Sequence, residues 1–266
     1  MEEPSASFTS PLALLPTLHL DGAWQMAIDA WMLDQRRPML RLYRWRRPTL
    51  SLGHHQRRLE PHWLELARQG VIDLVRRPSG GRAVLHGGDL TYALVWPDAT
   101  GSREQVYRRA CFWLQQAFAE FGLPLQFGRQ AATAQPASCF GLSTAADLVH
   151  ADGSKRIGSA QLWRQGCLLQ HGSIQVDPPQ ALWRELFESP APQLPALPVA
   201  GEALEQALIA SAARWLPMAA GGVVPVGLEA PALAAISRMA PLVQVDLASP
   251  EASIERTTGA SARPRG

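Results

Sequence analysis

The sequence predicts an α+β fold. Two stretches, 22–34 and 105–121, carry apolar residues at three-to-four spacing, which is typical of helices that pack one face on a core. Strand-like segments lie between and after them, including 40–45, where two leucines alternate with other residues. Because helices and strands are mixed without strict alternation, this order favours α+β over a doubly wound parallel sheet.

The expected elements follow in order along the chain. Asp21 is expected to cap the first helix, and Gly70 and Gly122 to end the second and third. Asp152-Gly153 is expected to join two strands as a hairpin turn, and Gly172 to kink the strand that follows. The expected strands are 40–45, 49–52, 71–76, 82–86, 90–96, 147–151, 157–163 and 166–176, and the expected helices are 22–34, 61–69, 105–121, 180–187, 202–215 and 230–239.

The chain is expected to consist of an N-terminal extension (1–20), a core (21–188), a C-terminal helical extension (189–248) and a disordered tail (249–266), and the composition shifts to Pro and Ala where the third of these begins. No apolar run reaches the ~18 residues that a membrane span requires, so no membrane association is expected. The Met-Glu-Glu start lacks the basic region of a secretory signal. With three scattered cysteines and no disulfide pattern, the expected location is the cytoplasm.

The charged residues narrow the class of partner. A net charge of +2 argues against nucleic-acid binding. Eight arginines and no acid lie between residues 36 and 58, which is either a landing patch for an acidic partner or an ordinary solvated surface. Of the 25 basic residues all but one are arginine, and the single lysine is Lys155. A compact ammonium is not interchangeable with a guanidinium, so Lys155 is a candidate functional residue.

A Gly-rich segment, 76–86, separates two expected strands. Its adjacent Gly80 and Gly81 permit positive φ and close approach to a ligand, and their N–H groups are suited to an oxyanion or a phosphate. The segment is neither a Walker A loop nor a dinucleotide fingerprint. Taken alone, it is better interpreted as a hairpin turn.

Cys139 lies in a polar, Ala-rich loop before Lys155. A nearby ammonium would lower the pKa of the thiol and stabilise a developing oxyanion. The residues alone favour Cys139 only modestly over Cys167, and Cys111 and Cys167 are both expected to pack in apolar elements.

His86 and His171 each end an apolar strand, and either a structural or an acid–base role fits them. The seven histidines show no ligand spacing, so no metal site is expected.

Several of these segments together resemble the biotin/lipoate protein ligase superfamily. Residues 76–86, followed by Asp89-Leu90-Thr91-Tyr92, are similar to its signature loop, and Gly158-Ser159-Ala160-Gln161 with residues 170–174 are similar to its second signature. Residues 47–53, with Gln56, resemble its early strand and turn. The resemblance covers about residues 21–187.

Within that superfamily the chain resembles the cysteine-dependent octanoyl-[acyl carrier protein]:protein N-octanoyltransferases more than lipoate-protein ligase A. Arg82 stands where the ligases have a third glycine, Ser138-Cys139-Phe140 is similar to the nucleophile segment of the transferases, and Lys155 matches the superfamily's active-site lysine. The chain departs from the transferases at Gly87 and Gly141, where they usually have acidic residues.

The resemblance implies a mixed β-sheet flanked by helices and a two-step reaction. Cys139 would take an octanoyl group from octanoyl-acyl carrier protein as a thioester, and a lysine of a lipoyl carrier domain would then accept it. The carrier domain would be a glycine cleavage H protein or a 2-oxoacid dehydrogenase E2. No cofactor would be required. Lys155 would assist Cys139, and the implied substrate-binding residues are Arg77, Ser79, Gly80, Gly81, Arg82, His86, Gly158, Ser159, Ala160, His171 and Gly172.

Two other functions fit the residues. An ATP-dependent lipoate-protein ligase would use the same loop and Lys155 to bind lipoyl-AMP with ATP and Mg²⁺, leaving Cys139 without a role. An acyl-carrier relay would bind carrier domains without turnover.

Overall fold

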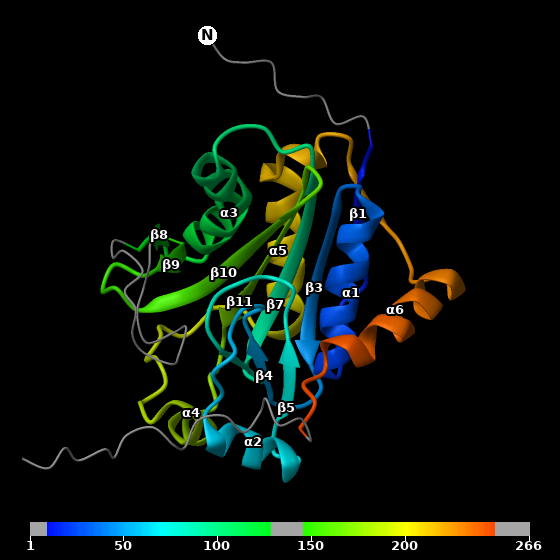
Figure 1. The fold of residues 1–266 in the computed structure, drawn as a ribbon. Coiled ribbons are helices and arrows are strands. Elements are labelled where there is room, and N and C mark those ends of the chain that lie inside the picture. Colours follow the sequence, from blue (N-terminus) through cyan, green and yellow to red (C-terminus); the bar gives the residue numbers. More distant parts are fainter. Residues whose placement is uncertain (1–9, 129–145, 248–266) are drawn as a thin grey trace, which may run out of the picture.

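The computed structural model describes residues 10–128 and 146–247, in which nine strands form one mixed sheet (Figure 1). The sheet has the order β12-β1-β3-β7-β11-β10-β9-β8, and β2 pairs with β3 beside β1. Its strands are β1 (Leu12–Leu14), β2 (Leu18–Leu20), β3 (Met39–Trp45), β7 (Asp89–Pro97), β8 (Gln126–Phe127), β9 (Asp147–Val149), β10 (Lys155–Arg164), β11 (Cys167–Gln175) and β12 (Val223–Pro225).

Helices cover both faces of this sheet because its central strands are apolar on both sides. On β7, Leu90, Tyr92 and Leu94 pack toward α3 (Arg103–Glu120) and α5 (Gly201–Trp215), whereas Ala93 and Val95 pack toward α1 (Gly22–Gln35) and α6 (Ala230–Val243). Figure 1 shows the two helix pairs on opposite sides of the strands. The main sheet is therefore the buried middle layer, with a core above and below it.

A second, smaller sheet lies at one end of the main sheet (Figure 1). It has the order β5-β4-β6, in which β4 is parallel to β5 and antiparallel to β6. Trp63 and Trp183, from two short helices, fill its core. The Gly-rich segment joins two of its strands. The elements are β4 (Thr49–Leu52), β5 (Asp73–Arg76), β6 (Val84–His86), α2 (Pro61–Arg68) and α4 (Gln180–Phe187).

The α+β prediction is confirmed, and most expected elements are present. The strand at 49–52 and the helix at 180–187 have the predicted bounds, and β9 and β10 pair antiparallel across the predicted Asp152-Gly153 turn. The third helix begins at Arg103, earlier than expected, because Ser102 and Gln105 form a capping box. Four short strands, β1, β2, β8 and β12, were not predicted.

Three local predictions are wrong. The Gly-rich segment is not a hairpin turn, because the strands that it joins, β5 and β6, lie on opposite sides of β4 and do not pair with one another. Asp21 occupies the N-cap position of α1, but its side chain makes no cap hydrogen bond and instead pairs with Arg46 at 3.3 Å. Pairing of β11 with both neighbours runs without a break through Gly172, and the irregularity lies between Lys155 and Ile157 of β10. A Cβ on Gly172 would lie 2.5 Å from Ser159 Oγ, so glycine is required there by close packing.

Segments on either side of the predicted core also contribute to the sheet. β1 and β2 come from the predicted N-terminal extension, and both pair with β3. β12, from the predicted C-terminal extension, pairs with β1, and α5 and α6 cover opposite faces. The division at residues 20, 188 and 248 stays a prediction, and the tail at 249–266 lies outside the described residues.

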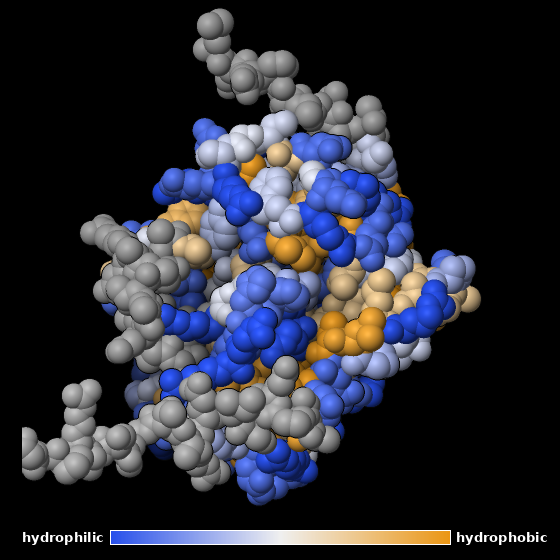
Figure 2. Space-filling model, in the orientation of Figure 1, coloured by the Kyte–Doolittle hydropathy of each residue, from blue (hydrophilic) through white to orange (hydrophobic). Residues whose placement is uncertain are grey.

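The surface of α6 is largely apolar (Figure 2). Leu233 is 44% exposed and Leu242 is 82% exposed, while Ile236 and Ala240 face α1. Among the described residues, no helix is long and apolar enough to cross a membrane.

Gly53, which follows β4, provides a test of how closely the Gly-rich loop packs against the end of this strand. A Cβ at Gly53 would lie 1.8 Å from the carbonyl oxygen of Gly81, so Gly53→Ala must displace the Gly-rich loop. We expect a loss of roughly 1–3 kcal/mol in the free energy of unfolding, measured by urea denaturation. The matched control is Gly80→Ala, since nothing lies within 4 Å of a Cβ there. Equal stabilities of the two variants would contradict this packing.

Candidate active site

A cavity of about 90 Å³ opens where the main sheet meets the Gly-rich loop of the small sheet. The residues that line it come from α1, both sheets and the loop between β5 and β6. Most of the predicted site residues are among them: Arg77, Gly80, Gly81, His86, Lys155, Gly158, Ser159, Ala160, His171 and Gly172. Segments that are far apart in the sequence therefore meet around one space, as a substrate site requires.

Lys155 is one of two cations among the described residues that line this cavity, and Arg77 is the other. Lys155 begins β10 after the hairpin turn, and its Nζ lies 2.8 Å from Asp147 Oδ1 on the neighbouring strand β9. Both side chains are only 5% exposed. Asp147, which also lines the cavity, was not predicted from the sequence. The pair places a buried ammonium at a fixed position beside the Gly-rich loop.

The Gly-rich loop is held from inside by Arg77. The guanidinium of Arg77 donates hydrogen bonds to the carbonyl oxygens of Gly80 at 2.8 Å, Arg82 at 2.7 Å and Ser51 at 2.8 Å. Gly81 has φ of +99°, a conformation that favours glycine. The loop is therefore a preformed structure whose carbonyl groups are engaged by one buried side chain.

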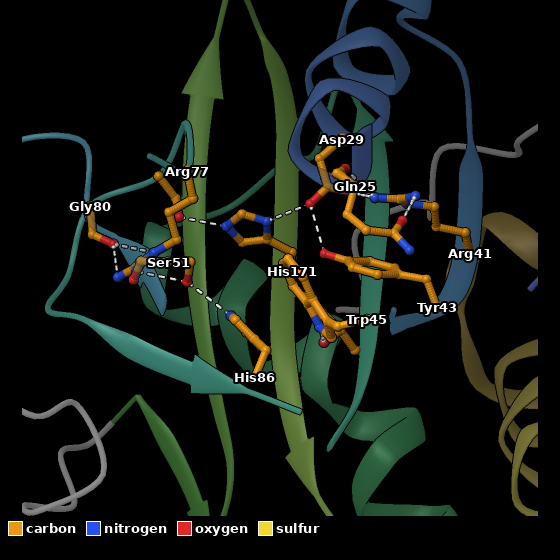
Figure 3. A network of polar contacts seen from close by, with 12 residues as sticks. Gln25, Asp29, Arg41, Tyr43, Trp45, Ser51, Arg77, Gly80, His86 and His171 are labelled. Carbon is orange, nitrogen blue, oxygen red and sulfur yellow. Dashed lines mark hydrogen bonds and ion pairs between the residues drawn. The ribbon is translucent and has the colours of Figure 1, made fainter. Parts of the chain in front are cut away.

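A second line of contacts runs from this loop through His171 into the core (Figure 3). His171 Nε2 lies 2.5 Å from Ser79 Oγ, and His171 Nδ1 lies 2.8 Å from Asp29 Oδ2. Asp29, fully buried on α1, also accepts hydrogen bonds from Arg41 and from Tyr43. Burial alone would raise the pKa of Asp29, but Arg41 and His171 outweigh it and hold this pKa below its ordinary value.

His86 is held in a similar way on the other side of the cavity. Its Nε2 lies 2.8 Å from Ser51 Oγ and its Nδ1 lies 2.8 Å from Asp89 Oδ2, while Trp45 stacks on the ring with centroids 4.0 Å apart. Burial would raise the pKa of Asp89, but the contacts with His86, Ser173 and the Gly87 amide lower it. Both histidine rings thus use both nitrogens in hydrogen bonds, which favours the structural interpretation of each.

The remaining wall is formed by β10 and β11. Gly158, Ser159 and Ala160 face Ser173, Gly172 and His171 across the antiparallel pair. The hydroxyls of Ser159 and Tyr92 lie 2.8 Å apart. These contacts fix the backbone where the second signature lines the cavity.

The other predicted residues fall elsewhere. Ser79, a residue of the loop itself, is fully buried, and Arg82 contributes its carbonyl to Arg77 without lining the cavity. Cys139 and Gly141 lie outside the described residues. Cys111 and Cys167 are buried as expected; burial raises the pKa of Cys111 to about 12 and also raises that of Cys167. Neither of these two is suited to form a thiolate.

The arginines between residues 36 and 58 are not all at the surface. Arg41 is 1% exposed and pairs with Asp29. The remaining pairs join an arginine of this run to an acid elsewhere in the chain: Arg44 to Glu205, Arg46 to Asp21, Arg47 to Asp73 and Arg58 to Glu60. The described part of the chain also contains no cluster of His, Cys, Asp or Glu that would hold a metal ion.

Three carboxylates that organise the site were not predicted to have a role in it: Asp29, Asp147 and Asp89, which the sequence offered only as part of the segment after the Gly-rich loop. The available signal for Asp29 is its place beside Ile28 on a helix expected to face the core, because a buried carboxylate needs a partner. Which partner it finds depends on the sheet.

Comparison with known proteins places this arrangement in a family. Residues 21–196 match the family model described as lipoyl protein ligase A/B catalytic domain. The chain belongs to this family. Among its relatives, Octanoyltransferase LipM of Kyrpidia tusciae is 35% identical over 229 residues, covering 73% of this chain and 83% of that protein. The LipM of Halalkalibacterium halodurans is 34% identical over 188 residues, covering 64% of this chain and 68% of that protein.

Solved structures show the same lipoyl ligase fold. A lipoate-protein ligase A bound with ATP has a TM-score of 0.69 at 17% identity, covering 87% of this chain and 94% of that one. A bi-partite lipoate protein ligase of Thermoplasma acidophilum, described with its E2 lipoyl domain, has a TM-score of 0.68 at 14% identity, covering 94% and 100%. At these identities the likeness concerns the fold, and it confirms the predicted mixed sheet flanked by helices.

Asp29→Asn tests the network behind the cavity. The substitution leaves the buried Arg41 guanidinium without its counter-charge, so we expect a loss of roughly 3–5 kcal/mol in the free energy of unfolding at neutral pH. Because the pKa of Asp29 is lowered on folding, its stabilisation is present at neutral pH and is lost as the pH falls through the folded-state value. The difference in the free energy of unfolding between wild type and Asp29→Asn, measured by urea denaturation, should therefore become smaller at acidic pH.

The control is Asp34→Asn on the same helix, where the side chain is 41% exposed and pairs with Arg164. The loss in the free energy of unfolding for Asp34→Asn should stay within about 1 kcal/mol at every pH. A loss for Asp29→Asn that matches this control would show that the network does not stabilise the fold.

Proposed function

We propose that this chain is an acyltransferase of lipoate biosynthesis, which moves an octanoyl group from octanoyl-acyl carrier protein to a lysine of a lipoyl carrier domain. The relatives named octanoyltransferase support the reaction. The observation that carries the proposal is the position of Lys155, a buried ammonium that lines the same cavity as the Gly-rich loop. Such a donor suits the oxyanion that forms when a thioester is attacked.

The first step exchanges one thioester for another. The thiolate of Cys139 attacks the octanoyl carbonyl, a new C–S bond forms, and the carrier's thiolate leaves and takes up a proton. The two thiols have similar leaving-group character, so the step needs no ATP. Lys155 would stabilise the developing negative charge, a contribution worth about 3–4 kcal/mol for one well-placed donor.

The second step forms the product amide. The neutral ε-amine of the target lysine attacks the Cys139 thioester, the C–N bond forms, and the C–S bond breaks. The proton lost by the amine returns to the sulfur. Dividing the transfer into two steps in this way is covalent catalysis. No metal or other cofactor is part of the proposal.

The apolar part of the cavity would hold the acyl chain. Met26, Tyr43, Trp45 and Val84 line it between α1 and the Gly-rich loop. Burial of an eight-carbon chain at ~0.8 kcal/mol per methylene contributes roughly 5 kcal/mol, which is enough to discriminate chain length. We further propose that the amides around Gly80 and Gly81 help to orient the carbonyl.

The lipoate ligase alternative rests on the solved structures, whose identities of 14–20% concern the fold alone. The sequence relatives at 34–35% identity favour the transferase. The proposed acceptor, a lipoyl carrier domain, agrees with the E2 lipoyl domain named with the ligase of T. acidophilum.

The acyl-enzyme can be detected by mass. After incubation with octanoyl-acyl carrier protein and no acceptor, wild type should gain one octanoyl group that hydroxylamine removes. Cys139→Ala should gain none and should not modify a lipoyl domain. Cys167→Ala, which removes a buried thiol of β11, should behave as wild type. Octanoylation of the lipoyl domain by Cys139→Ala would contradict the covalent route.

A further inference from the structure

Lys155 could itself be acylated in the reaction that the proposed function assigns to this cavity. Its side chain ends in the same group, an ε-amine, as the intended acceptor. If it were neutral, it would attack a thioester carbonyl bound beside it: a C–N bond would form, the C–S bond would break, and the amine proton would pass to the sulfur. The product, an octanoyl amide on Lys155, would be stable and would remove the ammonium from the site.

The position of Lys155 would allow this self-acylation. The side chain is 5% exposed and lines the cavity beside the apolar wall. Arg77, a second cation, lines the same cavity. Two cations at one buried cavity need a negative charge beside them, because an unpaired buried charge is strongly unfavourable.

Asp147 supplies that charge. Its Oδ1 lies 2.8 Å from Nζ of Lys155, and its side chain is as buried as that of the lysine. The position is firmly held, because Asp147 pairs with Gly158 across β9 and β10 and its carbonyl accepts a hydrogen bond from the amide of Gly128 at 2.9 Å. A carboxylate at this distance forms an ion pair with an ammonium and accepts a hydrogen bond from it.

We propose that Asp147 protects the enzyme from acylating itself, by keeping Lys155 a protonated hydrogen-bond donor that cannot act as an acceptor. The inference rests on the proposed function. It makes Asp147 a positioning residue that decides which amine receives the acyl group. The target lysine, which arrives from solvent, loses its proton and reacts, whereas Lys155 does not.

Lys155 is the only lysine of the chain, so an octanoyl group on a lysine of this protein can only be on Lys155. Wild type, Asp147→Asn and the double variant Asp147→Asn/Lys155→Arg are incubated with octanoyl-acyl carrier protein, treated with hydroxylamine to remove thioesters, and weighed. Peptide mapping then places any octanoyl group that remains. Octanoylation of a lipoyl domain is measured in parallel, to follow the proposed function separately.

We expect Asp147→Asn to accumulate hydroxylamine-resistant octanoyl on Lys155 at least about tenfold faster than wild type, the lower end of the effect of losing such a charge. Its transfer to the lipoyl domain should fall as the amide accumulates. The double variant should carry no amide. Asp147→Glu, which keeps a carboxylate, should accumulate less amide than Asp147→Asn. The matched control is Asp152→Asn, at the exposed turn of the same hairpin, which should resemble wild type.

Asp147→Asn that stays free of the amide while it still octanoylates the lipoyl domain would overturn the inference and leave the proposed function intact. Wild type that transfers nothing would overturn the proposed function and the inference with it. If Asp147→Asn does not fold, as judged by circular dichroism, Asp147→Ser is tested by the same criteria.

Discussion

The carboxylate of Asp29 is the contact on which the site is built. It is fully buried on α1, and it binds Arg41 and Tyr43 of β3 and His171 of β11. One charge therefore ties the first helix to two strands of the main sheet and, through His171 and Ser79, to the Gly-rich loop. A buried carboxylate without these partners would be strongly unfavourable, so the helix, the strands and the loop are placed together.

The ion pair of Lys155 and Asp147 has a different role from that of Asp29 and Arg41. Asp29 and Arg41 lie behind the wall and align it, whereas Lys155 and Asp147 line the cavity itself. Around them, the two histidines are held by carboxylates and serines, which leaves the ammonium as the group best placed to meet a developing oxyanion. Covalent acyl transfer needs a site of this kind: a rigid polar frame, an apolar space for the chain and one charge at the carbonyl.

Much of this arrangement could be predicted from the sequence, and there are physical reasons why the other elements and contacts could not. Local patterns predicted the long helices, the hairpin before Lys155 and the Gly-rich segment, because periodicity and turn residues act over short distances. The strands β1 and β12 are three residues each and exist because they pair with one another across the whole chain, a relation that no local pattern carries. The Asp29–Arg41 and Asp147–Lys155 pairs depend in the same way on which strands and helices become neighbours. Arg41 was expected within a surface run because its neighbours are basic, yet the cover provided by α1 makes it part of the core.

A crystal structure with an unreactive analogue would test the central claim most directly. In the analogue, a methylene replaces the sulfur of octanoyl-pantetheine, so that the carbonyl stays but no thiol can leave. The account predicts the carbonyl oxygen within hydrogen-bond distance of Nζ of Lys155, and the alkyl chain against Met26, Tyr43 and Trp45. A chain found instead in the apolar cavity of about 460 Å³ between α1 and α6, beside Trp24 and Leu233, would contradict it.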